Sequence, residues 1–176
     1  MTTTYANFDI PVAKTSIWVA VERYLETQRP DRLINGMAHV VVLLNFIDPF
    51  AEILVGKEGI QMRESLKQKF KDMPNSRMLG LRAKWVEDTI RDAVASGITQ
   101  IVNPACGLDT YAWRLNLPSQ VTYYELDFPE VINFKQSRLC NEQVLCNYKP
   151  IAVDLREASW TQKLIDSGFD STFIKP

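Results

Sequence analysis

The sequence predicts an α/β protein in which a parallel sheet follows a cap of helices. From Ile98 onward, short segments of β-branched and aromatic residues alternate with helical segments. That alternation is typical of parallel strands joined by right-handed crossovers. Before it, apolar residues recur at helical spacing. We therefore expect a helical cap region at 1–97 and a sheet unit at 98–176, which together form one compact body.

Three helices are predicted in the cap region, over residues 13–28, 58–71 and 78–96. The first has an amphipathic pattern and the second is mostly polar. The third is the strongest, because apolar residues such as Val86 and Ile90 lie one helical turn apart along it. These helices are expected to cover the sheet.

Three strands and three helices are predicted after the cap. The strands are expected at residues 98–103, 120–126 and 149–154. Helices are expected near residues 109–115, 129–142 and 160–167. Pro129 suits the first turn of the second of these helices, where a backbone N–H has no partner within the helix. This order brings the carboxyl ends of three parallel strands to one edge of the sheet.

Charge and hydropathy exclude several classes of function. The net charge of −1 gives no indication of a nucleic-acid partner. The apolar run at 40–47 is far shorter than the ~20 residues that a membrane helix needs, so we interpret it as a buried segment and expect no membrane association. Residues 1–10 lack the basic and apolar parts of a signal peptide.

Cysteine and histidine usage argues against a metal site. The chain has three cysteines and a single histidine, His39, and no C-x-x-C pair. Structural zinc needs four ligands at short paired spacings, so we expect no metal. A reduced, cytoplasmic setting fits this usage. Cys106 is interpreted as a small turn residue, because no histidine lies near it in sequence to act as its base.

A turn of small residues and two acidic residues mark the candidate site. The first strand runs into Ala105, Cys106 and Gly107, and the second ends in Glu125 and Asp127. In a parallel sheet this pattern places a nucleotide-like ligand across the carboxyl ends of two strands, where a carboxylate can accept both hydrogen bonds of a ribose diol. The two acidic side chains lie two apart on a strand and point the same way. Spacing therefore leaves both as candidates, and Asp127 has an alternative role as a helix cap.

The segments "VNPACGLDTYAWRL" and "YYELDFPEV" resemble the leucine carboxyl methyltransferase family, in its broad bacterial-type branch. Further segments in family order are "TSIWVAVERYLE", "RPDRLI", "DPFAEILVG", "LRAKWVEDTI" and "AVDLREASW". The resemblance covers most of the chain. It implies a Rossmann-like parallel-sheet fold and S-adenosyl-L-methionine (AdoMet) as cofactor. It also implies methyl transfer to a carboxylate or hydroxyl of a small-molecule or peptide acceptor.

Within this resemblance, the turn and the second strand take defined roles. Ala105 stands where relatives have glycine, and we expect it to serve if its φ is negative. Gly107 matches the family glycine of the turn. The family pattern favours Asp127 over Glu125 as the ribose ligand. Asp109 and Arg114 are expected to hold the turn by a salt bridge.

The resemblance assigns three further residues to the cofactor. Asp154 and Leu155, at the end of the third strand, would lie beside the adenine, with Asp154 accepting from its exocyclic amine. Arg82 matches the arginine that binds the methionine carboxylate in relatives, a role that suits a bidentate guanidinium. No residue of this chain can be named as catalytic.

Two features depart from the family. Residues 35–47 are an additional, mostly apolar segment, which either extends a helix or strand into the core or is an error of the gene model. The chain also ends soon after the third strand, whereas relatives continue with four more strands. We therefore expect an incomplete sheet, an open apolar edge at the third strand and self-association through it.

Two other interpretations compete with an active methyltransferase. One is a catalytically inactive AdoMet-binding remnant or interaction module, suggested by the early end and by Ala105. The other is a nicotinamide-dependent enzyme on a similar sheet. The second is disfavoured because the turn lacks the G-x-G-x-x-G pattern.

Overall fold

The computed structural model describes residues 11–28, 33–34, 42–43, 48–67 and 76–173. Its centre is a parallel sheet of β3 (Gln100–Pro104), β4 (Thr122–Asp127) and β5 (Asn147–Ala152), in the order β3-β4-β5. The register pairs Val102 with Tyr124 and Tyr124 with Lys149. The parallel α/β arrangement predicted from the sequence is therefore confirmed.

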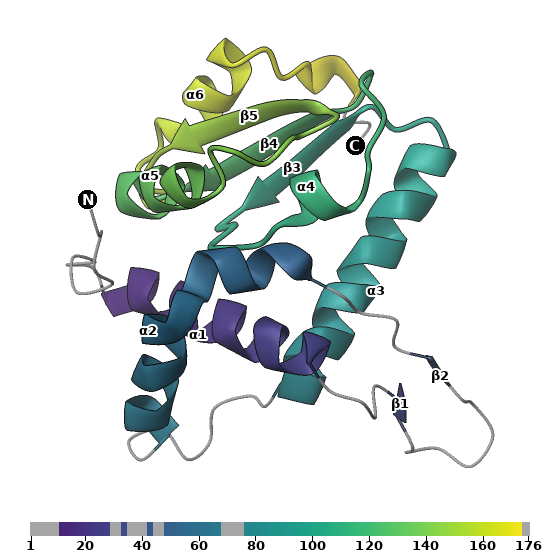
Figure 1. The fold of residues 1–176 in the computed structure, drawn as a ribbon. Coiled ribbons are helices and arrows are strands. Elements are labelled where there is room, and N and C mark those ends of the chain that lie inside the picture. The colour runs from purple at the N-terminus through teal and green to yellow at the C-terminus, as the bar shows by residue number, and fades with distance from the viewer. Residues whose placement is uncertain (1–10, 29–32, 35–41, 44–47, 68–75, 174–176) are drawn as a thin grey trace.

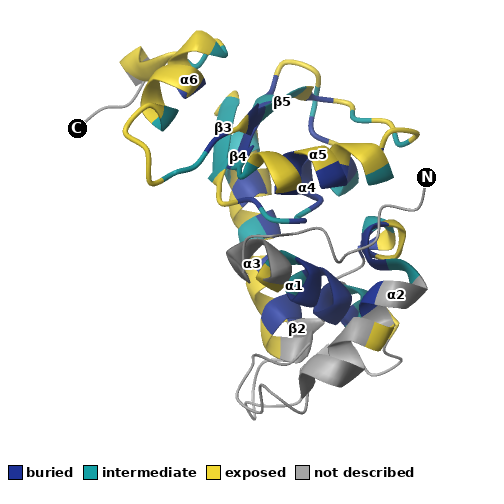
Figure 2. Cartoon of the chain, turned by 90° about the vertical axis from the view of Figure 1, so that its left-hand side faces the viewer, coloured by how far each residue is buried: buried dark blue, intermediate teal, exposed yellow. Residues whose placement is uncertain are grey.

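Helices cover both faces of the sheet. The short α4 (Tyr111–Arg114) and α5 (Pro129–Arg138) pack on one face, in a core that includes Tyr123. The opposite face carries Tyr124 and is covered by α6 (Trp160–Asp166). Figure 2 shows that most of α6 is exposed, whereas α5 has a buried side against the sheet. A last turn of 3-10 helix covers Ser171–Phe173.

The three helices predicted before the sheet are present, with different limits for the second. The helices are α1 (Pro11–Thr27), α2 (Pro49–Lys67) and α3 (Ser76–Ala95). The prediction placed the second helix at 58–71, but α2 begins at Pro49 and bends at Gly56, whose φ is 53°. That bend interrupts the helical spacing, which is why the sequence pattern conceals the first half of α2. Figure 1 shows α1 and α2 lying across the end of the sheet to which the strand arrows point.

The apolar segment at 35–47 falls mostly outside the described residues. Its described part is the strand β2 (Val42–Leu43), which pairs antiparallel with β1 (Leu33–Ile34). The prediction that this segment is buried stays untested. None of the described helices is long and apolar enough to cross a membrane.

Buried ion pairs attach the cap to the sheet. Arg23 of α1 donates from Nε to Asp48 Oδ2 at 3.0 Å and from Nη1 to Asp109 Oδ1 at 2.5 Å. Arg114 of α4 donates from Nε to Glu87 Oε1 of α3 at 2.7 Å. Asp109 and Arg114 were expected to hold the turn by a salt bridge, and each instead pairs with a residue of the cap, Arg23 and Glu87 respectively. These pairs fix α1 and α3 beside the turn that follows β3.

Candidate functional site

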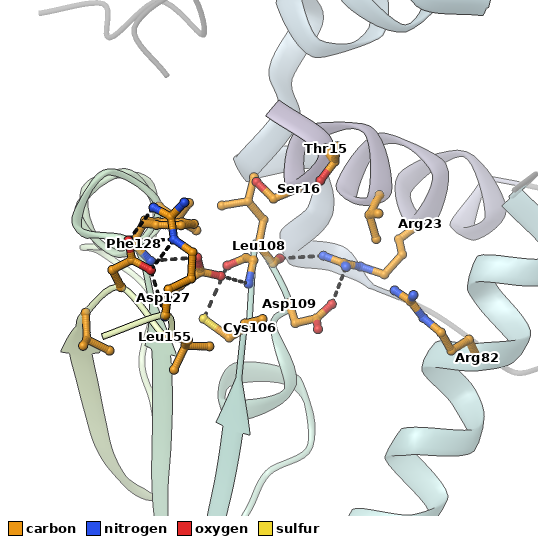
Figure 3. A pocket seen from close by; sticks show the side chains of 17 residues that line it. Thr15, Ser16, Arg23, Arg82, Cys106, Leu108, Asp109, Asp127, Phe128 and Leu155 are labelled. Carbon is orange, nitrogen blue, oxygen red and sulfur yellow. Dashed lines mark hydrogen bonds and ion pairs between the residues drawn. The ribbon is translucent and has the colours of Figure 1, made fainter. Parts of the chain in front are cut away.

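A cavity of about 460 Å³ lies at the carboxyl ends of the three strands. Its walls come from α1, from Arg82 of α3, from the turn at 105–109, and from residues 127–128 and 153–156 after β4 and β5. Figure 3 shows these side chains converging between the strand ends and the cap helices. The position is the one that parallel α/β proteins use for ligands.

The turn after β3 contains two residues with left-handed backbone conformations. The φ angles are 51° at Ala105 and 53° at Gly107. The condition under which Ala105 was expected to replace the family glycine, a negative φ, is therefore not met. The chain must reverse sharply as it leaves β3, and the Cys106 N–H donates to the carbonyl of Leu126 on β4 at 3.2 Å, which holds the turn against the sheet. A left-handed conformation costs a non-glycine residue about 1–2 kcal/mol.

Gly107 is required by two features of its surroundings. Its positive φ favours glycine, and a Cβ at this position would lie 3.2 Å from Cβ of Ser16. The N-terminal half of α1 thus packs directly on the turn. A larger residue here would be strained by the positive φ and would require Ser16 to shift by a few tenths of an ångström.

Asp127 joins the end of β4 to the turn. Its Oδ2 accepts from the Gly107 N–H at 2.7 Å, and its Oδ1 accepts from the Phe128 N–H at 2.7 Å. A carboxylate has about four lone-pair sites, so roughly two remain for a ligand. The N-cap residue of α5 is Phe128, which makes no side-chain cap bond, so capping by Asp127 is limited to that one N–H.

Glu125 lies behind the cavity and is not one of its lining residues. It is fully buried, and its Oε2 accepts from Lys135 Nζ and from the Tyr148 hydroxyl, both at 2.7 Å. Burial raises the pKa of the Glu125 carboxyl, and Lys135 offsets only part of that rise. The side chain that shares a strand face with Asp127 is thus committed to an internal ion pair.

Cys106 also faces this buried pair. Its Sγ lies 3.4 Å from Lys135 Nζ, and the residue is 1% exposed. Burial raises the pKa of the thiol well above its ordinary value, and the charge of Glu125 adds to that rise. A protonated, buried thiol is a poor nucleophile, which agrees with interpreting Cys106 as a turn residue.

Asp154 and Leu155 line the cavity beyond the end of β5. The predicted strand ended at Asp154, whereas β5 ends at Ala152. The Val153 N–H still donates to the Asp127 carbonyl at 2.8 Å, so the two strand ends stay together. Asp154 itself is held by Arg156, whose Nε lies 2.9 Å from Oδ1 and 3.0 Å from Oδ2. Hydrogen bonding from Arg156 lowers the pKa of Asp154.

Arg82 lies at the other end of the cavity, on an exposed position of α3. Among the described residues, its guanidinium has no hydrogen-bond or ion-pair partner. Figure 3 shows it directed from α3 toward Asp109, on the far side of the turn from Asp127 and Phe128. The cavity therefore has the Arg82 guanidinium near Asp109, with Asp127 on the other side of the turn.

Comparison with known proteins agrees with this geometry. The family model described as leucine carboxyl methyltransferase matches residues 16–174. This chain belongs to the leucine carboxyl methyltransferase family. The predicted resemblance is confirmed, and with it the Rossmann-like character of the sheet.

Individual relatives give the same result. A relative from Mycobacteroides abscessus is 35% identical over 169 residues, which are 91% of this chain and 50% of that protein. One from Mycobacterium bovis is 34% identical over 171 residues, covering 91% of this chain and 52% of the relative. Both are provisionally named S-adenosyl-L-methionine-dependent methyltransferases. The chain thus spans about half the length of the curated relatives it matches.

Several cavity residues escaped prediction from the sequence. The cavity is lined by residues of α1, among them Ser16 and Arg23, and by Arg156 after β5. Arg23 is 2% exposed although charged residues are seldom buried, and it is buried because Asp48 and Asp109 pair with it. Helical periodicity identifies apolar faces only, so nothing in α1 by itself signals this role.

Proposed function

We propose that this chain forms the AdoMet-binding part of an O-methyltransferase that acts on a carboxylate or hydroxyl. One observation carries the proposal. Asp127 lies at the carboxyl end of the middle strand, beside the turn that contains Gly107, and faces a cavity large enough for a nucleoside-sized ligand. This is where a ribose diol is recognised in doubly wound sheets.

The charges along the cavity suit AdoMet from end to end. Asp127 retains acceptor sites for the two ribose hydroxyls. Asp154 and Leu155 lie beyond β5 on the side expected for adenine, and Asp154 offers a carboxylate to the exocyclic amine. Arg82 lies at the opposite end, where its guanidinium would pair with the methionine carboxylate. The residues present therefore fit the cofactor.

When bound, AdoMet supplies a methyl group activated by the adjacent sulfonium. The protein's part is then to hold the donor in line with the acceptor. Asp127 and the turn would fix the ribose, and Arg82 would fix the amino-acid end. A carboxylate acceptor requires no general base, and we nominate none.

A second candidate is AdoMet binding without turnover. Ala105 favours it, because the left-handed conformation at this position strains any residue but glycine. A methyl-transfer assay with radiolabelled AdoMet and small carboxylate or hydroxyl acceptors separates the two candidates.

Calorimetric titration tests the cofactor assignment. We expect binding of AdoMet in preference to NAD, and weaker binding by Asp127→Ala, because each charge-assisted hydrogen bond contributes on the order of 1.5–3 kcal/mol. Asp127→Asn keeps an acceptor for the Gly107 N–H while removing the charge, so it shows whether a loss is due to the ligand contact or to the turn. Asp166→Ala, at an exposed position on α6, is the control. Equal AdoMet affinity in wild type and both Asp127 variants would contradict the assignment.

The partners and setting follow from the same chemistry. The methyl acceptor would be a small molecule or a peptide, and the net charge of −1 gives no reason to expect nucleic acid. All three cysteines are free thiols, which suits a reducing, cytoplasmic compartment.

A further inference from the structure

Asp154, the carboxylate placed to recognise the adenine, already has both of its oxygens bound by Arg156. The Arg156 backbone N–H donates to Oδ1 at 3.0 Å. The Arg156 side chain adds two donors: the Nε–H, which is shared between Oδ1 at 2.9 Å and Oδ2 at 3.0 Å, and Nη2, which donates to Oδ2 at 2.5 Å. Three N–H groups of one residue thus occupy most of the approximately four lone-pair sites of this carboxylate.

Asp127 provides the contrast within the same cavity. Its two oxygens accept one backbone N–H each, so acceptor sites remain on both. Asp127 can thus accept from a ribose as it stands, whereas the Arg156 side chain competes with any ligand for both oxygens of Asp154. The Arg156 side chain can move away from Asp154, since 79% of it is exposed. The hydrogen bond from the Arg156 backbone N–H can stay in place.

Arg156 also spans the gap between two strand ends. Its Cζ lies 5.6 Å from the centre of the Phe128 ring, which follows β4, while its donors hold Asp154 after β5. Phe128, Asp154 and Arg156 all line the cavity. The guanidinium therefore lies across the end of the cavity where a purine would approach.

We propose that Arg156 is an internal competitor for the adenine amine: its side chain occupies Asp154 and must be displaced before this carboxylate can recognise a 6-aminopurine. This inference rests on the proposed AdoMet function. Arg156 acts through Asp154 and sets both affinity and purine selectivity, without touching the methyl group. Exposed ion pairs contribute little free energy, so displacement should alter the dissociation constant by roughly two- to five-fold.

The test is an NMR titration with S-adenosylhomocysteine, which carries the adenine but no transferable methyl group. Four proteins are compared at low salt: wild type, Arg156→Gln, Asp154→Ala and the double variant. Arg156→Gln should bind this ligand more tightly than wild type. The gain should vanish when Asp154 is alanine, because the competition needs the carboxylate.

Two further measurements separate competition from a structural effect. Salt screens an exposed pair, so the advantage of Arg156→Gln over wild type should shrink as salt is raised. The purine riboside analogue of S-adenosylhomocysteine lacks the exocyclic amine and has no N1–H, so it cannot donate to Asp154 from this edge, and Arg156→Gln should not improve its binding. Lys163→Gln removes the same charge from an exposed position on α6 and should leave both ligands unaffected.

The outcomes distinguish this inference from the proposed function. If wild type and Arg156→Gln bind S-adenosylhomocysteine equally, or if the variant binds more weakly, the competitor role is wrong while AdoMet binding stands. A gain that persists in the Asp154→Ala background also overturns it. If neither wild type nor Arg156→Gln binds the ligand and NAD binds instead, the proposed function fails and this inference fails with it.

Discussion

Ala105 holds a left-handed backbone conformation at the mouth of the cavity. From sequence alone, Ala105→Gly is expected to lower stability slightly, because glycine adds chain entropy to the unfolded state. The φ of 51° reverses that sign. We predict that Ala105→Gly raises the free energy of unfolding by about 1 kcal/mol and tightens AdoMet binding.

Urea unfolding checks this prediction against a matched control. Ala152→Gly changes an exposed alanine at the end of β5, which is not among the described residues with a positive φ. The free energy of unfolding of that variant should be lower than that of wild type by roughly 0.5–1 kcal/mol. A less stable Ala105→Gly protein would show that the turn is not strained.

At the scale of elements, α5 is attached to β4 by the ion pair between Lys135 and Glu125, with both side chains at 0% exposure. Removing one partner leaves a buried charge unpaired. We therefore predict that Lys135→Met or Glu125→Gln alone destabilises the protein by about 3–5 kcal/mol. The double variant should lose much less free energy of unfolding than the two single variants together, because it leaves no buried charge unpaired.

A double-mutant cycle in urea measures that coupling. The exposed pair of Lys84 and Asp88 on α3 is the control, and Lys84→Met should cost less than about 1 kcal/mol. If the losses of unfolding free energy from the Lys135 and Glu125 variants are additive, the two residues act independently and the predicted coupling is wrong.

The sequence predicts the elements of this fold better than it predicts their connections. Helical and strand spacing located α3 and all three strands of the parallel sheet, because those elements follow a regular apolar pattern. The bend at Gly56 interrupts such a pattern, and the burial of Arg23 depends on Asp48 and Asp109, which are distant in sequence. Asp127 and Glu125 could not be separated by spacing; only the position of Lys135 in space commits Glu125 to the core.

At the scale of the whole molecule, the described sheet has two edges. The predicted edge at the third strand, β5, is present, but β5 carries Lys149 and Pro150, the residue types that protect an edge from further pairing. The other edge is β3, which has no lysine and has its only proline at its last position. In the doubly wound order 3-2-1-4, the next strand adds beside the first, which is β3 here.

We therefore predict that self-association of this chain uses β3. Light scattering after size-exclusion chromatography should show species larger than a monomer. Hydrogen exchange should slow with protein concentration at amides of β3 and not at those of β5. A monomer at all concentrations, or protection confined to β5, would contradict this.

The most direct test of the proposed AdoMet site is to find where the cofactor binds on the molecule. We propose to record backbone amide shifts of the ¹⁵N-labelled protein while S-adenosylhomocysteine is added. We predict that the largest shift changes fall at Gly107, Asp127 and Leu155, around the carboxyl ends of the strands, and that Asp127→Ala raises the ligand concentration needed to produce them. Changes confined to α6, or no saturable changes while NAD produces them, would contradict it.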